Sequence, residues 1–423
     1  MSLPANPTTA LAAFVFRRAQ LSWRGLSFDR KPAESVSERM RLKMDVCWTI
    51  AIGLAMIDPI RAGAFQSMHM LLALESGDVR RVARALAVEV PFSATPGPRN
   101  HARTAMLTAR AEALASEVGD PHVDGLLAGS VGGAAWLEGD WTNGLTMSVR
   151  GDEMVRTQCT GMAWNLDTTT IVRFDCLYRL GRWNEVIDAV PEVLADARAR
   201  GDLYMEVYSI IKLGTLARIA ADQPELAADE LAQAITRWSK ERFTLLHYWE
   251  VYGQCEAALY RRKPVDAEKR LHDGTKGVKS SLLLQLQLYR VSWVDLRGRV
   301  ALASASSRAL RFGALRAVDA AVRELQGEDV AWSRALGALL RAGALATRTD
   351  REGSARALRE AARELSAVGM ELHAAVALAR LAEITGDIAG IEAAHADIAS
   401  RGIANPARIV EVMAPGLYAA LAK

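Results

Sequence analysis

The stretch Gly-Asp-Leu-Tyr-Met-Glu-Val-Tyr-Ser-Ile-Ile-Lys-Leu-Gly-Thr-Leu-Ala-Arg-Ile-Ala-Ala-Asp-Gln-Pro, residues 201–224, decides the fold. Its apolar residues recur three and four positions apart, which is typical of a helix with one buried face. Asp202 stands before the apolar run as an expected N-cap, and Pro224 is expected in the first turn of the next helix. The stretch therefore predicts one helix between two short polar breaks.

Breaks of the same kind return along the chain at a fixed interval. One set falls at positions 139, 181, 222 and 263, roughly 41 residues apart, and a second set falls between them at 119, 161, 201 and 242. Two breaks per period indicate two helices per period, which is the signature of stacked helix pairs. The sequence therefore predicts an all-α fold, an α-solenoid of antiparallel helix pairs with about twenty helices and a period of about 41 residues.

The repeat is less regular near the start of the chain. We expect residues 1–100 to form an N-terminal helical region with less regular repeats, and residues 101–423 to form the solenoid, continuous with the first region. Residues 92–100 form the densest Pro/Gly loop. Pro191 lies inside a predicted helix, which it is expected to kink or to split at Val190.

The composition is that of a folded protein without an obvious charged partner. Hydrophobic residues make up 50% and charged residues 24% of the 423 residues, and the formal net charge is +3. The near balance gives no indication of nucleic acid or membrane as a partner, and the basic excess in residues 1–45 is interpreted as a solvated helix face. Without a secretory pattern or an apolar run of about 20 residues, we expect a cytoplasmic protein with free thiols.

Motifs of known chemistry do not occur in the sequence. The nearest imitation of a phosphate-binding loop, residues 274–280, lacks the required spacing and a preceding strand, and we interpret it as a loop between helices. The seven histidines are scattered, and paired carboxylates such as Glu360 and Glu364 have the helical spacing of a solvent face. The sequence therefore predicts no catalytic residue, no metal site and no cofactor, and a protein that is not an enzyme.

Aromatic and polar side chains gather on three predicted helices. Because alternate helices of a solenoid line its concave side, these residues could form a ladder along one groove, and Tyr, Trp and Arg are common anchors of interfaces. Aromatic residues four positions apart also commonly fill the core, so this alternative stays open. The candidate partner-binding residues are Tyr204, Tyr208, His247, Tyr248, Tyr252, Tyr289, Arg290 and Trp293.

Specific short stretches resemble a known family. They are Arg17-Arg18-Ala19-Gln20-Leu21, Asp45-Val46-Cys47-Trp48, Arg81-Val82-Ala83-Arg84-Ala85-Leu86, Arg200-Gly201-Asp202-Leu203-Tyr204 and Asn405-Pro406-Ala407-Arg408. The chain resembles the C-terminal tetratricopeptide-like helical-repeat region of large bacterial serine/threonine protein kinases, in which an AAA-like NTPase module follows the kinase domain. Since the nucleotide-binding and phosphate-transferring parts of that family lie upstream, the resemblance implies no catalytic residue in this chain.

Two functions are compatible with these observations. The first is a non-catalytic scaffold or sensory module of bacterial signal transduction, with a protein partner that the resemblance implies to be a kinase or an AAA-like ATPase. The second is a regulator that senses an effector by binding a small ligand in the lumen of the superhelix. Both depend on a curved helical surface, and the sequence alone does not choose between them.

Overall fold

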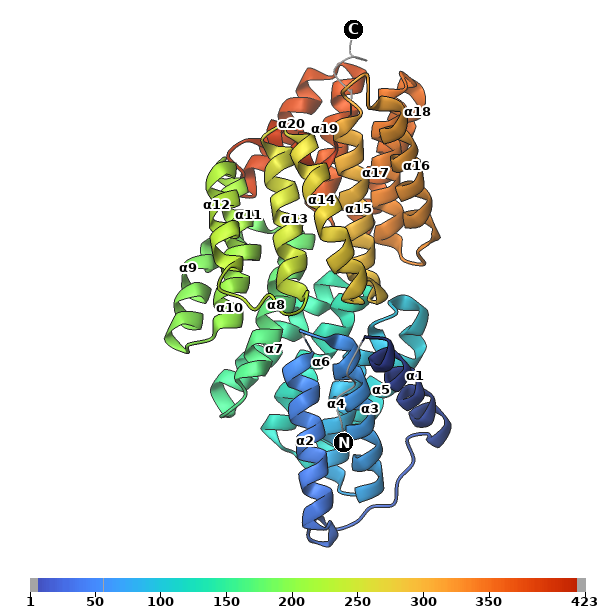
Figure 1. Cartoon of the computed structure of the whole chain (residues 1–423), viewed down its shortest axis with the longest axis vertical. Helices are drawn as coiled ribbons and strands as arrows, with labels where there is room; N and C mark the ends of the chain where they lie inside the picture. Colours follow the sequence, from blue (N-terminus) through green and yellow to red (C-terminus); the bar gives the residue numbers. More distant parts are fainter. Residues whose placement is uncertain (1–6, 56, 417–423) are drawn as a thin grey trace. The chain divides into compact units, whose positions relative to one another are not determined.

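The computed structural model describes residues 7–55 and 57–416, and this part of the chain is built from helices without any strand (Figure 1). About twenty helices follow one another, and neighbours in the chain pack against each other. The predicted all-α, solenoid-like fold is confirmed.

The recurring breaks act through two residues with different roles. Gly119 ends α5 (His101–Val118) with a positive φ of 60°, which glycine adopts without a steric penalty. Asp120 then caps α6 (Pro121–Glu138), where its carboxylate accepts a hydrogen bond from the His122 amide at 3.0 Å. Asp202 caps its helix in the same way, accepting from the Met205 amide at 2.9 Å. The Gly-Asp pairs therefore stop one helix and start the next.

The helices fall into two compact units. Unit 1 comprises the described residues up to Cys176 together with residues 279–288, and unit 2 comprises residues 177–278 and the described residues from Tyr289 onward. The division lies at Cys176 rather than near residue 100, where the sequence suggested a change in regularity. The helices on the two sides of residue 100 pack against each other, so no boundary forms there.

Unit 1 contains the first helices of the chain, and α6 and α7 approach each other closely through small residues. A Cβ atom on Gly151 of α7 would lie 2.7 Å from the amide nitrogen of Gly129 on α6, so this crossing requires glycine. Besides α5 and α6, the elements are α1 (Pro7–Arg24), η1 (Ala33–Ser35), α2 (Glu38–Leu54), α3 (Pro59–Ser76), α4 (Val79–Ala94), η2 (Pro98–Asn100), α7 (Trp141–Gln158), α8 (Ala163–Arg179, shared with unit 2) and η4 (Leu283–Gln285).

Unit 2 contains the remaining helices, of which α14 and α15 also extend into unit 1. They are α9 (Trp183–Ala199), α10 (Leu203–Tyr208), η3 (Ser209–Gly214), α11 (Thr215–Ala220), α12 (Pro224–Ile235), α13 (Leu245–Tyr260), α14 (Pro264–Ser280), α15 (Gln287–Ser304), α16 (Arg311–Gly327), α17 (Ala331–Thr347), α18 (Arg351–Ala367), α19 (Glu371–Thr385), α20 (Ile388–Ser400) and α21 (Pro406–Met413).

Three local expectations need correction in unit 2. The predicted helix over 203–221 contains a π-helical segment, Ser209–Gly214, between α10 and α11. Of the two outcomes expected at Pro191, a kink or a split at Val190, the split does not occur, because α9 continues from Trp183 to Ala199. Residues 274–280 belong to α14 and not to a loop, and Gly274 and Gly277 are accommodated because Val251 and Phe243 pack closely over them.

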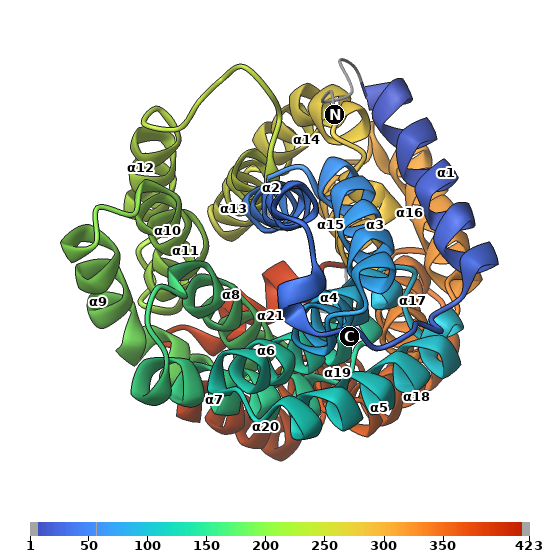
Figure 2. The same ribbon diagram turned by 90° about the horizontal axis from the view of Figure 1, so that it is seen from below.

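The last helices of unit 2 return to its first ones. The Arg401 guanidinium donates a hydrogen bond to the Gly181 carbonyl at 3.1 Å, and a Cβ atom on Gly402 would lie 3.2 Å from the side chain of Ile187 on α9. The short helix α21 contacts α13, α19 and α20, and in Figure 2 it lies among them in the interior. Unit 2 is therefore a closed array of helices with its own C-terminal helix inside.

Candidate functional site

The sequence placed eight aromatic and polar residues on three helices, and the structure brings four of them together. Tyr248 of α13 is the centre of the group. The centroid of its ring lies 5.5 Å from that of Tyr289 and 5.7 Å from that of Trp293, both on α15, and 6.2 Å from that of Tyr252. The Tyr248 hydroxyl donates a hydrogen bond to the Tyr289 carbonyl at 3.1 Å. The expected meeting of side chains from successive inner helices is therefore observed.

These side chains, however, form an interior cluster and not an open ladder. Tyr248 has no exposed surface, and Tyr208, Tyr252, Tyr289 and Trp293 are also buried. The prediction that they line a partner-binding groove is wrong for this structure. Helical periodicity identifies residues that share one face of a helix, but it does not show what covers that face. Here neighbouring helices cover it, so a partner protein cannot reach these side chains.

The other three candidates are half-buried and make contacts within the chain. Tyr204 packs edge-on against Trp238, with ring centroids 5.6 Å apart. His247 Nδ1 accepts a hydrogen bond from the Thr244 amide at 3.1 Å, which helps to cap α13. Arg290 forms an ion pair with Glu328. Each of these side chains therefore serves a local structural contact.

Next to the aromatic cluster, the π-helical segment presents a lysine to aromatic faces. The Lys212 ammonium lies 3.7 Å from the ring centroid of Trp249 and 4.5 Å from that of Tyr178, distances at which a cation is attracted to the ring. A cavity beside it leaves about 20 Å³ for the centre of a water molecule. The widened turn of the helix thus seats Lys212, and the space around it is nearly filled.

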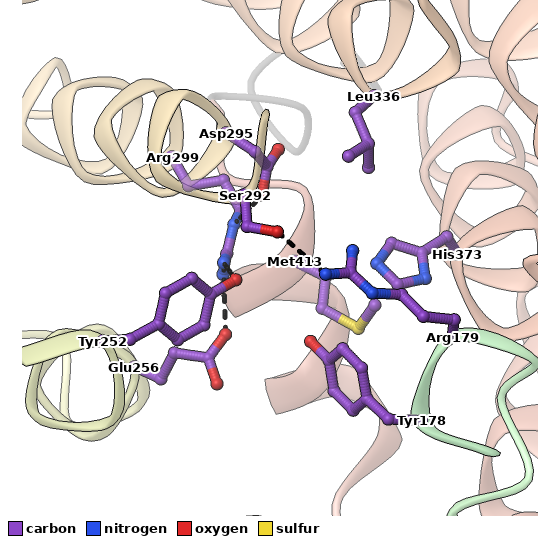
Figure 3. Close-up of a pocket in the computed structure, with 10 residues that line it drawn as sticks. All are labelled: Tyr178, Arg179, Tyr252, Glu256, Ser292, Asp295, Arg299, Leu336, His373 and Met413. Atoms are coloured by element: carbon purple, nitrogen blue, oxygen red, sulfur yellow. Dashed lines mark hydrogen bonds and ion pairs between the residues drawn. The ribbon is translucent and has the colours of Figure 1, made fainter. Parts of the chain in front are cut away.

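Beyond these aromatic residues lies a buried group of charged side chains, which we call the unit 2 polar cluster. Figure 3 shows side chains from several inner helices directed toward one small space. The cluster consists of Tyr178, Arg179, Tyr252, Glu256, Ser292, Asp295, Arg299 and His373.

Arg299 of α15 is the centre of the polar cluster. Its guanidinium donates to Asp295 at 2.8 Å, to the Tyr252 hydroxyl at 2.9 Å and to Glu256 at 3.1 Å. Although burial opposes it, Tyr252 and the two carboxylates raise the pKa of Arg299 well above its ordinary value. The guanidinium therefore stays charged and holds both acids in place.

Arg179 and His373 form the other side of the cluster. Arg179 donates a hydrogen bond to the Ser292 hydroxyl at 2.8 Å, and its guanidinium carbon lies 4.9 Å from the Trp332 ring centroid. Burial, reinforced by Arg179 and Arg299, lowers the pKa of His373 from its usual 6.5 to about 3. His373 is therefore neutral at physiological pH, and the cluster balances two guanidiniums against two carboxylates.

Arginines from the inner helices also hold α21. Arg299 donates to the Val412 carbonyl at 3.4 Å, while Arg380 of α19 donates to the Ala414 carbonyl at 2.8 Å and to the Val410 carbonyl at 3.4 Å. Positive groups near the last carbonyls of a helix satisfy acceptors that have no partner within the helix. The open space in the cluster admits the centre of a water molecule over only about 10 Å³, enough for about one water. The unit 2 polar cluster is therefore a filled core that holds a helix.

Unit 1 contains a different kind of site, which the sequence did not reveal. A recess lies between α2, α4, α6 and α8, and the volume that the centre of a water molecule can reach in it is about 650 Å³. Trp48, Arg84 and Trp164 are among the residues that line it. Small organic ligands occupy cavities of about 300–1,000 Å³. The one signal in the sequence was the basic stretch Arg80-Arg81 followed by Arg84. From the sequence, only the basic excess of residues 1–45 was interpreted, as a solvated helix face.

Comparison with known proteins adds no assignment. No family model, no curated protein and no solved structure matches the chain. The resemblance to the kinase-associated repeat region therefore stays a prediction. Among the described residues, no group of three or more histidine, cysteine or acidic side chains is placed to hold a metal ion, and no helix has the length and apolar character to cross a membrane.

Proposed function

We propose that the chain is a non-catalytic binding module of signal transduction, which works by holding a protein partner, either a serine/threonine kinase or an AAA-like ATPase. The observation that supports this most directly is the grip on α21. Arg299 and Arg380 bind backbone carbonyls of that helix, and such contacts depend little on the side chains of the bound segment. An inner face that holds one helix in this way suits a helical segment of another protein.

The chemistry of the polar cluster favours binding over catalysis. Asp295 and Glu256, the two acids beside the space, both accept hydrogen bonds from Arg299. A general acid or base needs a proton to exchange with a substrate within hydrogen-bond distance, and the remaining space accommodates about one water molecule. The acids therefore act as counter-ions for the arginines.

The test is to release α21 without altering the inner helices. Val410 is fully buried on α21, so Val410→Asp places an unpaired charge in the contact and should detach the helix. Glu411→Gln, on the half-exposed side of the same helix, is the matched control. Both proteins and the wild type serve as baits in lysate of the source cells, and the bound proteins are identified by mass spectrometry.

We expect the V410D bait to enrich one kinase or ATPase relative to the wild type and E411Q. A synthetic peptide spanning residues 401–416 should compete for that partner, because both would occupy the same inner face. Circular dichroism serves as the check on folding, and V410D should keep its helical content. Recovery of no kinase or ATPase, or capture that the peptide does not reduce, contradicts the proposal.

A second candidate function, sensing of a small effector, has its own support. The unit 1 recess of about 650 Å³ is open and has the size of a site for a small organic molecule. The inner space of unit 2, in contrast, is occupied by α21 and by the polar cluster. If the chain senses an effector, unit 1 is where it binds.

A further inference from the structure

The unit 1 recess combines an apolar wall with a charged rim. Alternate helices of the chain surround it: α2, α4, α6 and α8. Its apolar surface comes from Trp48, Ile52, Leu126, Met162 and Trp164. Two tryptophans from different helices in one recess offer flat surfaces to a planar or elongated apolar group. The recess can therefore hold the body of an organic molecule.

Arg84 is the unusual charge of this recess. It is half-buried, its guanidinium carbon lies 3.6 Å from the ring centroid of Trp48, and no carboxylate of the described chain lies within ion-pair distance of it. The pKa of Arg84 is lowered from its usual 12.5 to about 10, mainly by burial; Asp45 opposes this shift, and Arg81 and Arg80 contribute to it. A guanidinium stacked on an indole keeps its N–H edge available for an anion.

The neighbouring acids are already engaged by other groups. Asp45 pairs with Arg81 at 2.8 Å, and Asp78 caps α4 through the Arg81 amide. Asp120 pairs with Arg80 and caps α6. Behind Trp48, burial lowers the pKa of His69 to about 3, so this ring adds no charge at physiological pH.

Two exposed charges remain at the rim, Glu34 and Arg41, which have opposite signs and no ion-pair partner. Their charges offset each other, and His122 is hydrogen-bonded to Asp120. Arg84 is therefore the one half-buried cation among the described lining residues without a counter-ion.

A buried amide adds a second, independent indication of a ligand. Asn165 of α8 lines the recess and is only 6% exposed, and its side chain has no hydrogen-bond partner within the described chain. The amide atoms of Asn165 are not among the fully enclosed polar atoms that lack a partner, so the amide meets the open recess, where water or a ligand can complete its hydrogen bonds. The amide can donate to an oxygen atom that enters the recess.

We propose that the unit 1 recess binds a small organic oxyanion, whose carboxylate or phosphate head is held by Arg84 and Asn165 and whose flat apolar body lies against Trp48 and Trp164. Arginine matches both kinds of head group, because its planar N–H groups can donate two parallel hydrogen bonds. Desolvation by the tryptophan walls strengthens this charge-assisted contact. The inference specifies the effector-sensing candidate and rests on it, but it does not require the protein partner.

The experiment is direct calorimetric titration of the purified full chain with four probes. These are 1-naphthoate, 1-naphthyl phosphate, the uncharged 1-naphthalenemethanol and inorganic phosphate. The first two share an aromatic body and differ in the head group, so they distinguish a carboxylate site from a phosphate site. The third lacks the charge, and the fourth lacks the apolar body.

We expect one aromatic anion to bind with 1:1 stoichiometry and at least tenfold more tightly than the neutral alcohol or inorganic phosphate. Arg84→Gln should weaken the anion by roughly 10- to 100-fold, since a charge-assisted hydrogen bond is lost, and leave the alcohol unchanged. Arg84→Lys should give an intermediate loss, and Asn165→Ala a loss of roughly fivefold.

Arg150→Gln is the matched control, because it removes the same charge from an exposed position on α7 where the arginine has no ion-pair partner. It should bind the anions like the wild type, and circular dichroism and melting should show that R84Q and R150Q are folded. Equal weakening in R84Q and R150Q, equal affinity for the anions and the alcohol, or no binding of either aromatic anion overturns the inference. None of these outcomes depends on the search for a protein partner.

Discussion

The polar cluster of unit 2 and the recess of unit 1 both contain arginines, carboxylates and a histidine, and they differ in how the charges are satisfied. Each places an arginine near a tryptophan, Arg179 at 4.9 Å from Trp332 and Arg84 at 3.6 Å from Trp48. In unit 2 the acids are bound by Arg299, and the space admits about one water molecule. In unit 1 Arg84 has no carboxylate within ion-pair distance among the described residues, and the recess is open.

This difference separates a structural use of buried charge from a binding use. Ionised groups lose hydration when they are buried, and a complete set of partners offsets that cost. For a cation without a counter-ion, the free energy lost with its hydration is not offset. Such an arrangement is expected at a binding site, where an anionic ligand supplies the missing counter-ion. The number of satisfied partners, more than the number of arginines, therefore distinguishes the two places.

The largest expected effect follows from breaking the filled cluster. Arg299→Met keeps the length of the side chain but leaves the buried Asp295 and the half-buried Glu256 without their counter-ion, which should destabilise unit 2 by about 3–5 kcal/mol. Arg84→Met should change the stability of unit 1 by less than about 1 kcal/mol, because it removes both a stacking contact and an unpaired charge. Hydrogen exchange read by mass spectrometry on peptides of each unit measures the two effects separately.

A second variant identifies the cause of that loss. In the double variant Arg299→Met/Asp295→Leu one of the orphaned carboxylates is gone, and part of the stability should return. Similar losses from R299M and R84M, each in its own unit, would show that the two sites do not differ in the way argued above.

The next effect concerns acid and should appear in both units. The folded-state pKa values of His373 in unit 2 and His69 in unit 1 are lowered to about 3, against 6.5 in the unfolded chain. The unfolded chain therefore binds more protons between these values, and stability that is complete above pH 6.5 decreases as the pH falls toward 3. At pH 5 each histidine should account for a loss of about 2 kcal/mol.

This loss is measured by urea denaturation at pH 7 and pH 5, with hydrogen exchange as the readout for peptides of each unit. His373→Leu should reduce the pH dependence of peptides from α19 and α21 and leave that of α3, which carries His69, unchanged. If the stability of unit 2 depends on pH in H373L as it does in the wild type, protonation of a group other than His373 causes the loss.

Local features of the fold could be predicted from the sequence because their causes are local. Gly119 and Asp120 act through their own backbone conformation and side chain, so the break was visible in two letters of sequence. The π-helical segment around Lys212 was not predicted, since the widened turn accompanies contacts with Trp249 and Tyr178, on other helices. Where packing between helices decides the geometry, the helical period is insufficient.

The same limit explains the candidate site. The spacing correctly put Tyr248 and Tyr252 on one face of α13, but it did not show that Tyr289 and Trp293 of α15 would cover that face. The unit 1 recess was missed for the opposite reason. Arg84 belongs to a stretch with many arginines, and only the fold shows which of them lacks an acid.

Smaller changes test hydrogen bonding at each place. Tyr252→Phe removes the hydroxyl that accepts from Arg299 at 2.9 Å, so unit 2 should lose about 1 kcal/mol. Asn165→Ala removes an amide that has no hydrogen-bond partner, so unit 1 without ligand should lose less or become slightly more stable. Denaturation midpoints of both variants at neutral pH measure the difference. A larger loss in N165A than in Y252F would indicate that the amide already has a structural role.

The smallest effect is expected at the surface of unit 2, where Arg262 pairs with Glu411 of α21 at 2.8 Å. The Arg262 side chain is 72% exposed, and pairs of this kind contribute less than about 1 kcal/mol because water and salt screen them. Arg262→Ala should therefore barely change the melting of the protein, and the difference should vanish at high salt. A large, salt-resistant loss would mean that α21 is held mainly from outside by charge. The buried carbonyl contacts with Arg299 and Arg380 would then be secondary, and unit 2 would be less closed than its filled interior implies.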